Sequence, residues 1–306
     1  MTDSYPRDLI GYADRPPHPQ WPGDAKIAVS FVLNYEEGGE RCILHGDKES
    51  EAFLSELPGA QPLPGKRHIS MESVYEYGSR AGVWRILNLF KKHDIPLTIF
   101  AVGMAAERHP AVIKTMFEQG HEICSHGYRW IDYQDVSIEA EKEDMQKAIA
   151  AIEEITGERP LGWYTGRTSP NTRRLVAEEG GFLYDSDAYD DDLPYWHTET
   201  GEPQLVIPYT LDSNDMRFST VQGFNSGEQF FQYLKDAFDC LYEEGAEAPK
   251  MLSIGLHCRL IGRPGRLGAL KRFIEYVQSH NSVWCARRID IAKHWHAKHP
   301  YTKTQG

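Results

Sequence analysis

Two glutamates and two histidines stand at the ends of apolar runs in this chain, where their side chains could carry out chemistry. Glu36 and Glu37 follow the first such run, and His126 and His257 each end or follow a later one. Proteins use carboxylate and imidazole groups as general bases and acids, and the same groups bind metal ions. The four residues therefore indicate acid–base chemistry, with or without a metal ion.

A phenol and a guanidinium, those of Tyr164 and Arg167, follow a further apolar run. Taken alone, a histidine at a strand end is usually a satisfied polar residue, and adjacent glutamates are usually a solvated pair. Their shared placement favours a joint role, because a barrel of βα units gathers its active site at the carboxyl ends of its strands. We therefore expect all of these residues to meet in one site.

Three arginines, Arg259, Arg263 and Arg266, come shortly after His257. They predict a positive patch at the end of the same strand. This patch could guide a polar group or a product carboxylate into the site. Alternatively, it could only balance the acidic surface of a chain whose formal charge is −12.

The elements that must position these side chains are short strands that alternate with helices. The predicted strands are 26–33, 96–102, 121–125, 162–164, 182–185, 205–208, 251–257 and 282–286. The predicted helices are 81–93, 139–156, 170–179, 227–243 and 266–279, and Gly157 is a candidate C-cap of the second. Alternation of this kind predicts a mainly parallel sheet.

The number of these units predicts an α/β fold in which one domain, residues 1–306, forms a distorted (β/α) barrel of about seven strands. An open doubly wound sheet is the alternative, although the chain has no glycine-rich phosphate loop. The segment 38–70, rich in glycine, proline and charge, breaks the alternation. Loops longer than about 12–15 residues tend to be functional or disordered. We expect this segment to be a lid or a subunit contact, with a mobile surface excursion as an equal alternative.

Composition excludes several classes of function. A formal charge of −12 argues against nucleic acid and anionic membranes as partners, and no apolar run approaches the roughly 20 residues that span a bilayer. The five cysteines are scattered, and the first residues show no secretory signal. We therefore expect a cytoplasmic protein with free thiols. The aromatic content and the segment 38–70 hint at a homo-oligomer.

The motifs resemble those of the polysaccharide deacetylase (NodB-homology) family over about residues 25–290. The family's first motif, an aromatic residue followed by Asp-Asp-Gly, resembles Tyr35-Glu36-Glu37-Gly38, and its last, Leu-His, resembles Leu256-His257. The resemblance implies the family's distorted barrel. It also implies that Glu36 is the general base, that Glu37 stands at a metal-ligand position and that His257 is the general acid.

The chain departs from the family at its second and third motifs. The second supplies two histidine ligands four residues apart, and Gly120–His126 fits the first of them, whereas Trp130 stands where the second should be. The third, Arg-x-Pro after a strand, corresponds only loosely to Trp163–Arg167. A tryptophan cannot ligate a metal ion, so the resemblance implies a site that has lost a ligand.

The lost ligand predicts an enzyme without a metal cofactor. A catalytic zinc ion normally has three protein ligands, so Glu37 and His126 alone would hold zinc weakly. Zinc bound through these two residues is the second choice, with Asp185 or Asp187 as a replacement ligand. Without zinc, water keeps a pKa near 15.7 instead of about 7, so a carboxylate base needs an easier reaction.

Opening a hydantoin ring is such a reaction, because the departing nitrogen is part of a urea that delocalises its charge. The run Trp163–Thr172 and the lost ligand resemble the allantoinase branch of the family. That branch opens the ring of allantoin to give allantoate in purine degradation. The resemblance implies a small ureide as substrate. A metal-dependent deacetylase of a small N-acetylated compound and a non-catalytic binding protein are the alternatives.

In the predicted mechanism Glu36 removes a proton from water and His257 protonates the leaving nitrogen. Like-charge repulsion from Glu37 is expected to raise the pKa of Glu36. Arg167 or the Tyr164 hydroxyl would stabilise the oxyanion.

The remaining predicted contacts to substrate come from Glu37, His126 and Trp130. His126 would donate a hydrogen bond and Trp130 would form an apolar plate for a flat ring. For Trp130, plain core packing is at least as strong an alternative.

Overall fold

The central strand of the fold is β1 (Ile27–Tyr35), and all nine of its residues are buried. It pairs in parallel with β8 (Lys250–His257) from Ile27 opposite Lys250 to Asn34 opposite His257. Near-continuous burial is expected of a parallel strand that is covered on both faces. This computed structural model describes residues 7–54, 57 and 59–303.

The other strands lie between and after these two. They are β2 (Thr98–Ala101), β3 (Glu122–Ser125), β4 (Gly162–Trp163), β5 (Tyr184–Asp185), β6 (Tyr195–His197), β7 (Gln204–Val206) and β9 (Val283–Cys285). The helices are α1 (Ile69–Tyr77), α2 (Val83–His93), α3 (Gly103–Arg108), α4 (Pro110–Glu118), α5 (Ile138–Thr156), α6 (Thr172–Glu179), α7 (Gly227–Glu244), α8 (Pro264–Gln278) and α9 (Arg288–Lys298).

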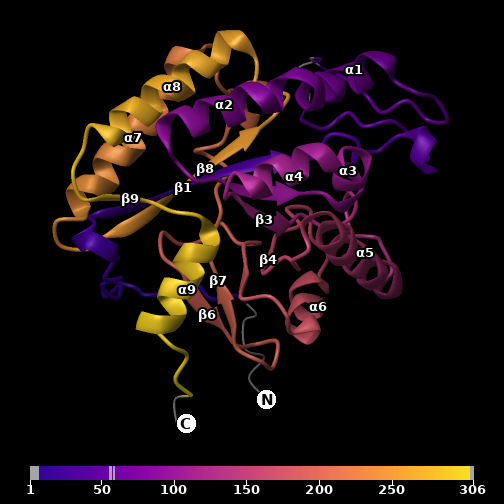
Figure 1. The fold of residues 1–306 in the computed structure, drawn as a ribbon. Coiled ribbons are helices and arrows are strands. Elements are labelled where there is room, and N and C mark those ends of the chain that lie inside the picture. The colour runs from indigo at the N-terminus through magenta and orange to yellow at the C-terminus, as the bar shows by residue number, and fades with distance from the viewer. Residues whose placement is uncertain (1–6, 55–56, 58, 304–306) are drawn as a thin grey trace.

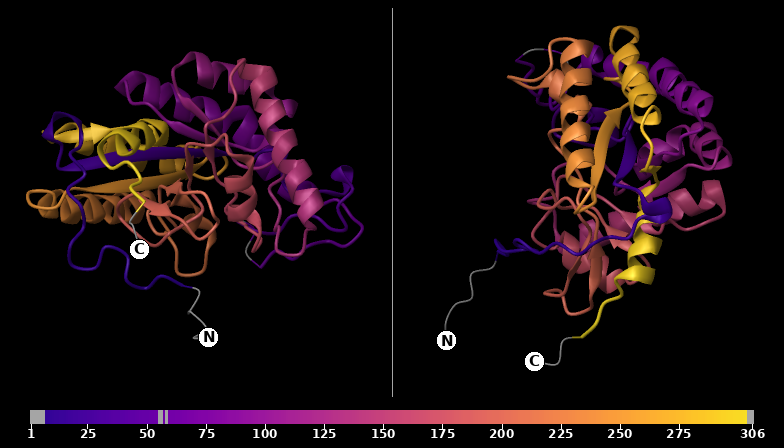
Figure 2. Two further views of the ribbon diagram at one scale, coloured as in Figure 1. Left: turned by 90° about the horizontal axis from the view of Figure 1, so that it is seen from below. Right: turned by 90° about the vertical axis from the view of Figure 1, so that its left-hand side faces the viewer.

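The sheet has the strand order β6-β7-β5-β4-β3-β2-β1-β8, and β9 pairs with the first residues of β1. Among the strand pairings of the described residues, that of β6 with β7 alone is antiparallel. The sheet curls into an incomplete barrel with helices around its outside (Figures 1 and 2). The prediction of a distorted (β/α) barrel is therefore confirmed. Strand β6 was not predicted, because three half-buried residues are too few to show a period.

The helices form where apolar residues recur on one face. In α2, Val83, Ile86, Leu87 and Phe90 are buried at helical spacing. Helix α5 ends at Gly157, whose φ of 77° is the left-handed conformation predicted for its C-cap. Helices α1, α3 and α4 were not predicted. Helices α3 and α4 lie between β2 and β3, where the sequence shows no long stretch of apolar residues at helical spacing.

Two glycines let the first helical layer approach the sheet closely. Helices α1 and α2 are joined by a π-helical turn, Gly78–Gly82. A Cβ at Gly78 would lie 2.3 Å from Oε1 of Glu37, and one at Gly82 would lie 2.0 Å from the carbonyl oxygen of Cys258. Both approaches exclude a larger residue. The close packing brings the buried Tyr75 of α1 to the carboxyl end of the sheet.

The segment 38–70 is anchored to the barrel in its first part. Ser50, Glu51 and Leu54 are buried, and Glu49 forms a β-bridge with Pro64. Residues 55, 56 and 58 of this segment lie outside the described residues. None of the helices in the described ranges is both long and apolar enough to cross a membrane.

Candidate active site

The structure brings Glu36, His126 and His257 together at the carboxyl end of the sheet. The Oε1 atom of Glu36 lies 3.4 Å from Nε2 of His126 and 3.5 Å from Nε2 of His257. All three side chains are buried. A carboxylate thus faces two imidazoles in a setting from which water is largely excluded.

Strand register explains why these residues meet. Tyr35 pairs with Ala101, and Ala101 pairs with Ser125, so the residues that follow Tyr35 and Ser125 leave neighbouring strand ends. Those residues are Glu36 and His126. On the other side of β1, His257 pairs with Asn34. Residues distant in sequence therefore meet because parallel strands end at one edge.

Asp215 holds the ring of His257 in place. Its Oδ1 atom lies 2.6 Å from Nδ1 of His257, and its Oδ2 atom accepts the backbone N–H groups of His257 at 2.8 Å and Ile261 at 2.9 Å. Burial on its own would lower the pKa of His257, but the carboxylates of Glu36 and Asp215 raise it to about 9. His257 therefore carries a proton near neutral pH. Sequence reasoning missed Asp215, because no spacing links it to His257.

Arg259 is the principal cation of the site. Its Nη1 atom lies 2.7 Å from Oε2 of Glu36 and 3.8 Å from Oε1 of Glu37. The guanidinium also lies over two rings, 4.3 Å from the centre of Tyr75 and 5.2 Å from that of Trp130. Of the three arginines predicted to form a patch after His257, Arg259 therefore lies in the site itself.

Arg259 decides the charge state of the adjacent glutamates. Burial would raise the pKa of Glu36, but Arg259, with His257, holds it well below its usual value. Burial raises the pKa of Glu37 to about 7, with Arg259 opposing and Glu36 adding to the rise. The expectation that Glu37 raises the pKa of Glu36 is thus wrong. The upward shift falls on Glu37, because Glu36 has the closer contact with the guanidinium.

The carboxylate of Glu37 contacts the backbone of Glu36 and lies against Gly78. Its Oε2 atom accepts the backbone N–H of Glu36 at 3.1 Å, and its Oε1 atom lies against Gly78 and toward Arg259. Contact with substrate through Glu37 stays a prediction. In this structure the side chain of Glu37 lies beside the guanidinium of Arg259, with 3.8 Å between Oε1 and Nη1.

The residues of this site do not fit a zinc ion. Within the described ranges, no group of three or more histidine, cysteine, aspartate or glutamate side chains is placed to hold a metal. A guanidinium contacts the carboxylate of Glu36, so a second positive charge there would meet repulsion. Asp185 and Asp187, considered as replacement ligands, are held by Arg173 and by the backbone N–H groups of Thr165 and Gly166.

Tyr164 and Arg167 contact different residues of the site. The Tyr164 ring is 4.8 Å from that of His126, and its hydroxyl is hydrogen-bonded to the Tyr189 hydroxyl at 2.9 Å. The Arg167 guanidinium lies 5.2 Å from the centre of Trp130. Trp130 therefore contacts both Arg167 and Arg259, and it also belongs to the hydrophobic core.

Several buried polar atoms around these residues have no hydrogen-bond partner among the described residues. They include the three guanidinium nitrogens of Arg259, Oε2 of Glu36, Oε1 of Glu37, Nδ1 of His126, the hydroxyl of Tyr75 and Oε2 of Glu51. A buried polar group without a partner typically costs about 1–3 kcal/mol. So many at one place indicate a site shaped for a small polar ligand that offers both donors and acceptors.

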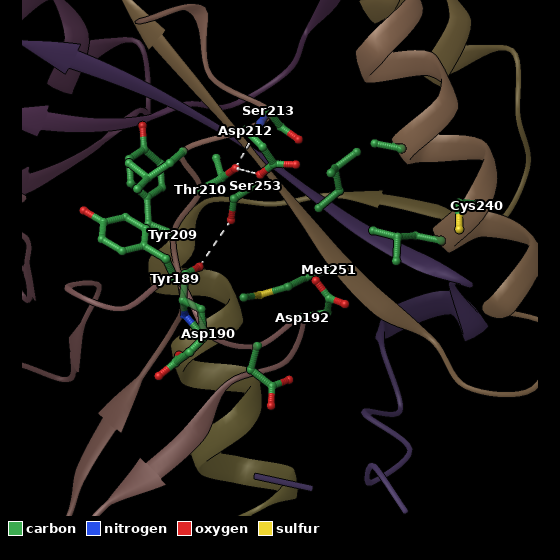
Figure 3. Close-up of a pocket in the computed structure, with 16 residues that line it drawn as sticks. Tyr189, Asp190, Asp192, Tyr209, Thr210, Asp212, Ser213, Cys240, Met251 and Ser253 are labelled. Carbon is green, nitrogen blue, oxygen red and sulfur yellow. Dashed lines mark hydrogen bonds between the residues drawn. The ribbon is translucent and has the colours of Figure 1, made fainter. Parts of the chain in front are cut away.

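A separate cavity of about 590 Å³ lies beside the first residues of β8 (Figure 3). Its walls carry Asp190, Asp191, Asp192 and Asp212. Tyr189 and Tyr209 also line it, and the Tyr189 hydroxyl contacts that of Tyr164. The cavity therefore lies behind the site, and the predicted acid and base do not line it.

Comparison with known proteins finds similarity to proteins described as polysaccharide deacetylases. The model of that family, "Polysaccharide deacetylase", matches residues 66–182. A protein of Schizosaccharomyces pombe described as "Putative polysaccharide deacetylase" is 49% identical, over 96% of this chain and 98% of its own length.

Two solved structures are more similar still. The crystal structure of a "probable Polysaccharide deacetylase" from Pseudomonas aeruginosa PAO1 is 73% identical, with a TM-score of 0.96 over 97% of this chain and 100% of the other. The crystal structure of Puue allantoinase is 75% identical, with a TM-score of 0.96 over 97% of this chain and 99% of the other.

Proposed function

This chain belongs to the polysaccharide deacetylase family, and from that premise we propose that it is a hydrolase that opens the hydantoin ring of allantoin to give allantoate without a metal ion. The observation that carries the proposal is the contact of Arg259 with Glu36 at 2.7 Å. A fixed guanidinium there supplies positive charge beside the base, where a deacetylase would use a metal ion. The identity of 75% to Puue allantoinase supports the substrate.

The first step is addition of water to the ring carbonyl carbon. Glu36 is ionised at neutral pH and accepts the proton as the water oxygen bonds to that carbon. A base held at a low pKa is weak, so the step depends on stabilising the product of the addition. Arg259, whose guanidinium N–H groups find no hydrogen-bond acceptor among the described residues, is the donor best placed to stabilise the oxyanion. It takes the role predicted for Arg167 or Tyr164.

The second step breaks the bond between that carbon and the ring nitrogen. His257, whose pKa of about 9 keeps it protonated, gives its proton to the departing nitrogen. That nitrogen is part of a urea, so little charge remains localised on it. The products of ring opening are a carboxyl group, which ionises, and a free ureido group, which accounts for every atom of water and substrate.

Removing bound metal should leave the activity unchanged. Protein treated with a chelator and then freed of it is expected to open the ring of allantoin at the rate of untreated protein, because the charges of the site come from Glu36, His257 and Arg259. The measurement is release of allantoate, with metal content determined on the same samples.

A carbohydrate deacetylase would behave in the opposite way. Loss of activity on chelation, recovery with one equivalent of zinc, and turnover of N-acetylated compounds would contradict the proposal and support a metal-dependent deacetylase. A lack of turnover on both substrate classes would support a binding protein instead.

Replacing Asp215 with asparagine should move the alkaline limit of activity to lower pH. The Asp215 carboxylate raises the pKa of His257, so its removal lowers that pKa, and activity requires His257 to be protonated. At a pH above the pKa of His257, each unit by which that pKa falls lowers the protonated fraction of His257 about tenfold. The pH profile of kcat/KM should show this, with a larger loss at pH 9 than at pH 6. An equal loss at both pH values, with an unmoved limb, would contradict the role of Asp215.

A further inference from the structure

Glu51 brings a buried carboxylate to the site from the segment 38–70. The residue is 4% exposed, and its Oε1 atom accepts the backbone N–H groups of Ala52 at 2.9 Å and Phe53 at 2.8 Å. Its Oε2 atom accepts no hydrogen bond from the part of the chain that the structure describes. The nearest cation, Nη1 of Arg167, is 3.6 Å away, which is longer than a hydrogen bond. One oxygen thus fixes the loop, and the other is left for a donor.

Arg167 lies beside this oxygen in a fixed orientation. Its guanidinium carbon is 5.2 Å from the ring centres of both Phe53 and Trp130, and these two rings are stacked with centres 6.0 Å apart. Contact with aromatic rings restricts a planar guanidinium, and Nη1 of Arg167 also donates to the carbonyl oxygen of Trp130 at 3.5 Å. Donors of Arg167 and an acceptor of Glu51 therefore stand side by side.

This pair lies next to the reacting groups. Trp130 is 5.2 Å from the guanidinium carbon of Arg259 as well as from that of Arg167, so these two carbons are separated by no more than twice that distance. Tyr75 lies near both arginines' shared neighbour, because its ring centre is 4.3 Å from the guanidinium carbon of Arg259 and 6.1 Å from the ring centre of Trp130. One small substrate can therefore contact both Arg259 and the pair formed by Glu51 and Arg167.

We propose that Glu51 and Arg167 bind a ureido arm on the substrate, so that this site selects hydantoins with a free ureido group on the carbon next to the reacting carbonyl. The inference rests on the proposed function. A ureido group presents N–H donors beside a carbonyl acceptor, which matches the acceptor of Glu51 beside the donors of Arg167. Its terminal nitrogen is four bonds from the reacting carbon, about 5 Å, which suits the spacing around Trp130.

The competing explanation is that Glu51 only anchors the loop. Glu51→Gln separates the two, because the amide oxygen can still accept the backbone N–H groups of Ala52 and Phe53. Its NH₂ group would replace the free oxygen with a donor, and a donor repels the N–H groups of a ureido arm. The matched control is Glu49→Gln. Glu49 lies in the same loop and has an ion pair with Arg41 at 3.3 Å, but its side chain is 34% exposed.

The test measures binding of two ligands by calorimetry, with Glu36→Gln as the parent so that nothing is turned over. The ligands are allantoin and hydantoin, which share the ring and differ in the arm. Adding Glu51→Gln is expected to weaken the binding of allantoin about tenfold or more, which is the loss in affinity typical of removing a hydrogen bond to a charged group. Hydantoin binding should change less than about twofold. Glu49→Gln should change neither.

Each other result overturns the inference. If the variant binds both ligands more weakly by the same factor, Glu51 contacts the hydantoin ring or only anchors the loop. If its affinity for allantoin is unchanged, Glu51 does not contact the substrate. If the parent binds neither ligand and the wild-type protein does not open allantoin, the proposed function itself fails. That outcome is recognisable before any Glu51 variant is made.

Discussion

Replacement of Glu36 with glutamine is expected to lower kcat for allantoin by at least about 10²-fold, the contribution of a positioned general base. Glutamine cannot accept the proton of the attacking water, whereas its size and its contacts with His126 and His257 are nearly preserved. Binding of hydantoin should persist, because Arg259 and Trp130 remain. The measurements are steady-state kinetics of allantoate release and calorimetry with hydantoin.

The loss of a buried charge could also unfold the protein, so a control is needed. Glu179→Gln removes a carboxylate that contacts Arg159 at the same distance of 2.7 Å but lies away from the site. It should leave kcat unchanged. Thermal unfolding of both variants then separates stability from chemistry. A kcat near that of wild type in a folded Glu36→Gln variant would eliminate Glu36 as the base.

Replacement of Arg259 with glutamine should lower kcat by about 10²–10³-fold, the usual cost of losing one oxyanion donor. The kcat of Arg259→Lys should lie between those of Arg259→Gln and wild type, because an ammonium keeps the charge but not the planar set of donors. The residue is fully buried between Glu36, Tyr75 and Trp130. Its removal should therefore also lower the melting temperature.

The pH profile distinguishes this role from a purely structural one. Arg259 holds the pKa of Glu36 below its usual value, and without it burial raises that pKa. Activity requires the ionised carboxylate, so the acidic limb of kcat/KM should move to higher pH in Arg259→Gln. Arg272→Lys serves as control, because Arg272 has an exposed ion pair with Glu228 at 2.9 Å and a ring contact with Phe231. An unmoved acidic limb in Arg259→Gln would contradict control of Glu36 by Arg259.

Local patterns in the sequence were enough to place most of the strands and the long helices. Strand β1 is a continuous apolar run, and α5 has both a helical period and a glycine cap. The unpredicted elements are short, such as β6 and α3, or are interrupted by glycines, as between α1 and α2. Short elements take their conformation from the packing around them, which a window of sequence does not contain.

Residue type and order alone predict which chemical groups stand at the strand ends. Glu36, His126 and His257 follow apolar runs, and a tryptophan replaces a metal ligand; both facts are properties of residue type and order. Because parallel strands end at one edge, these facts were enough to predict a shared site, whereas the barrel was predicted from the number of strand–helix units. They did not predict the charge states of the site.

Which residues act on these groups depends on how the chain folds in three dimensions. The barrel brings Asp215 to His257, Arg259 to Glu36 and Glu51 to Arg167. Each pairing depends on loops whose course no period or motif specifies. The pKa of a buried group follows from its desolvation and from the charges that surround it. For that reason the sequence alone could not show that Glu36 stays ionised while Glu37, its neighbour in the chain, has a pKa of about 7.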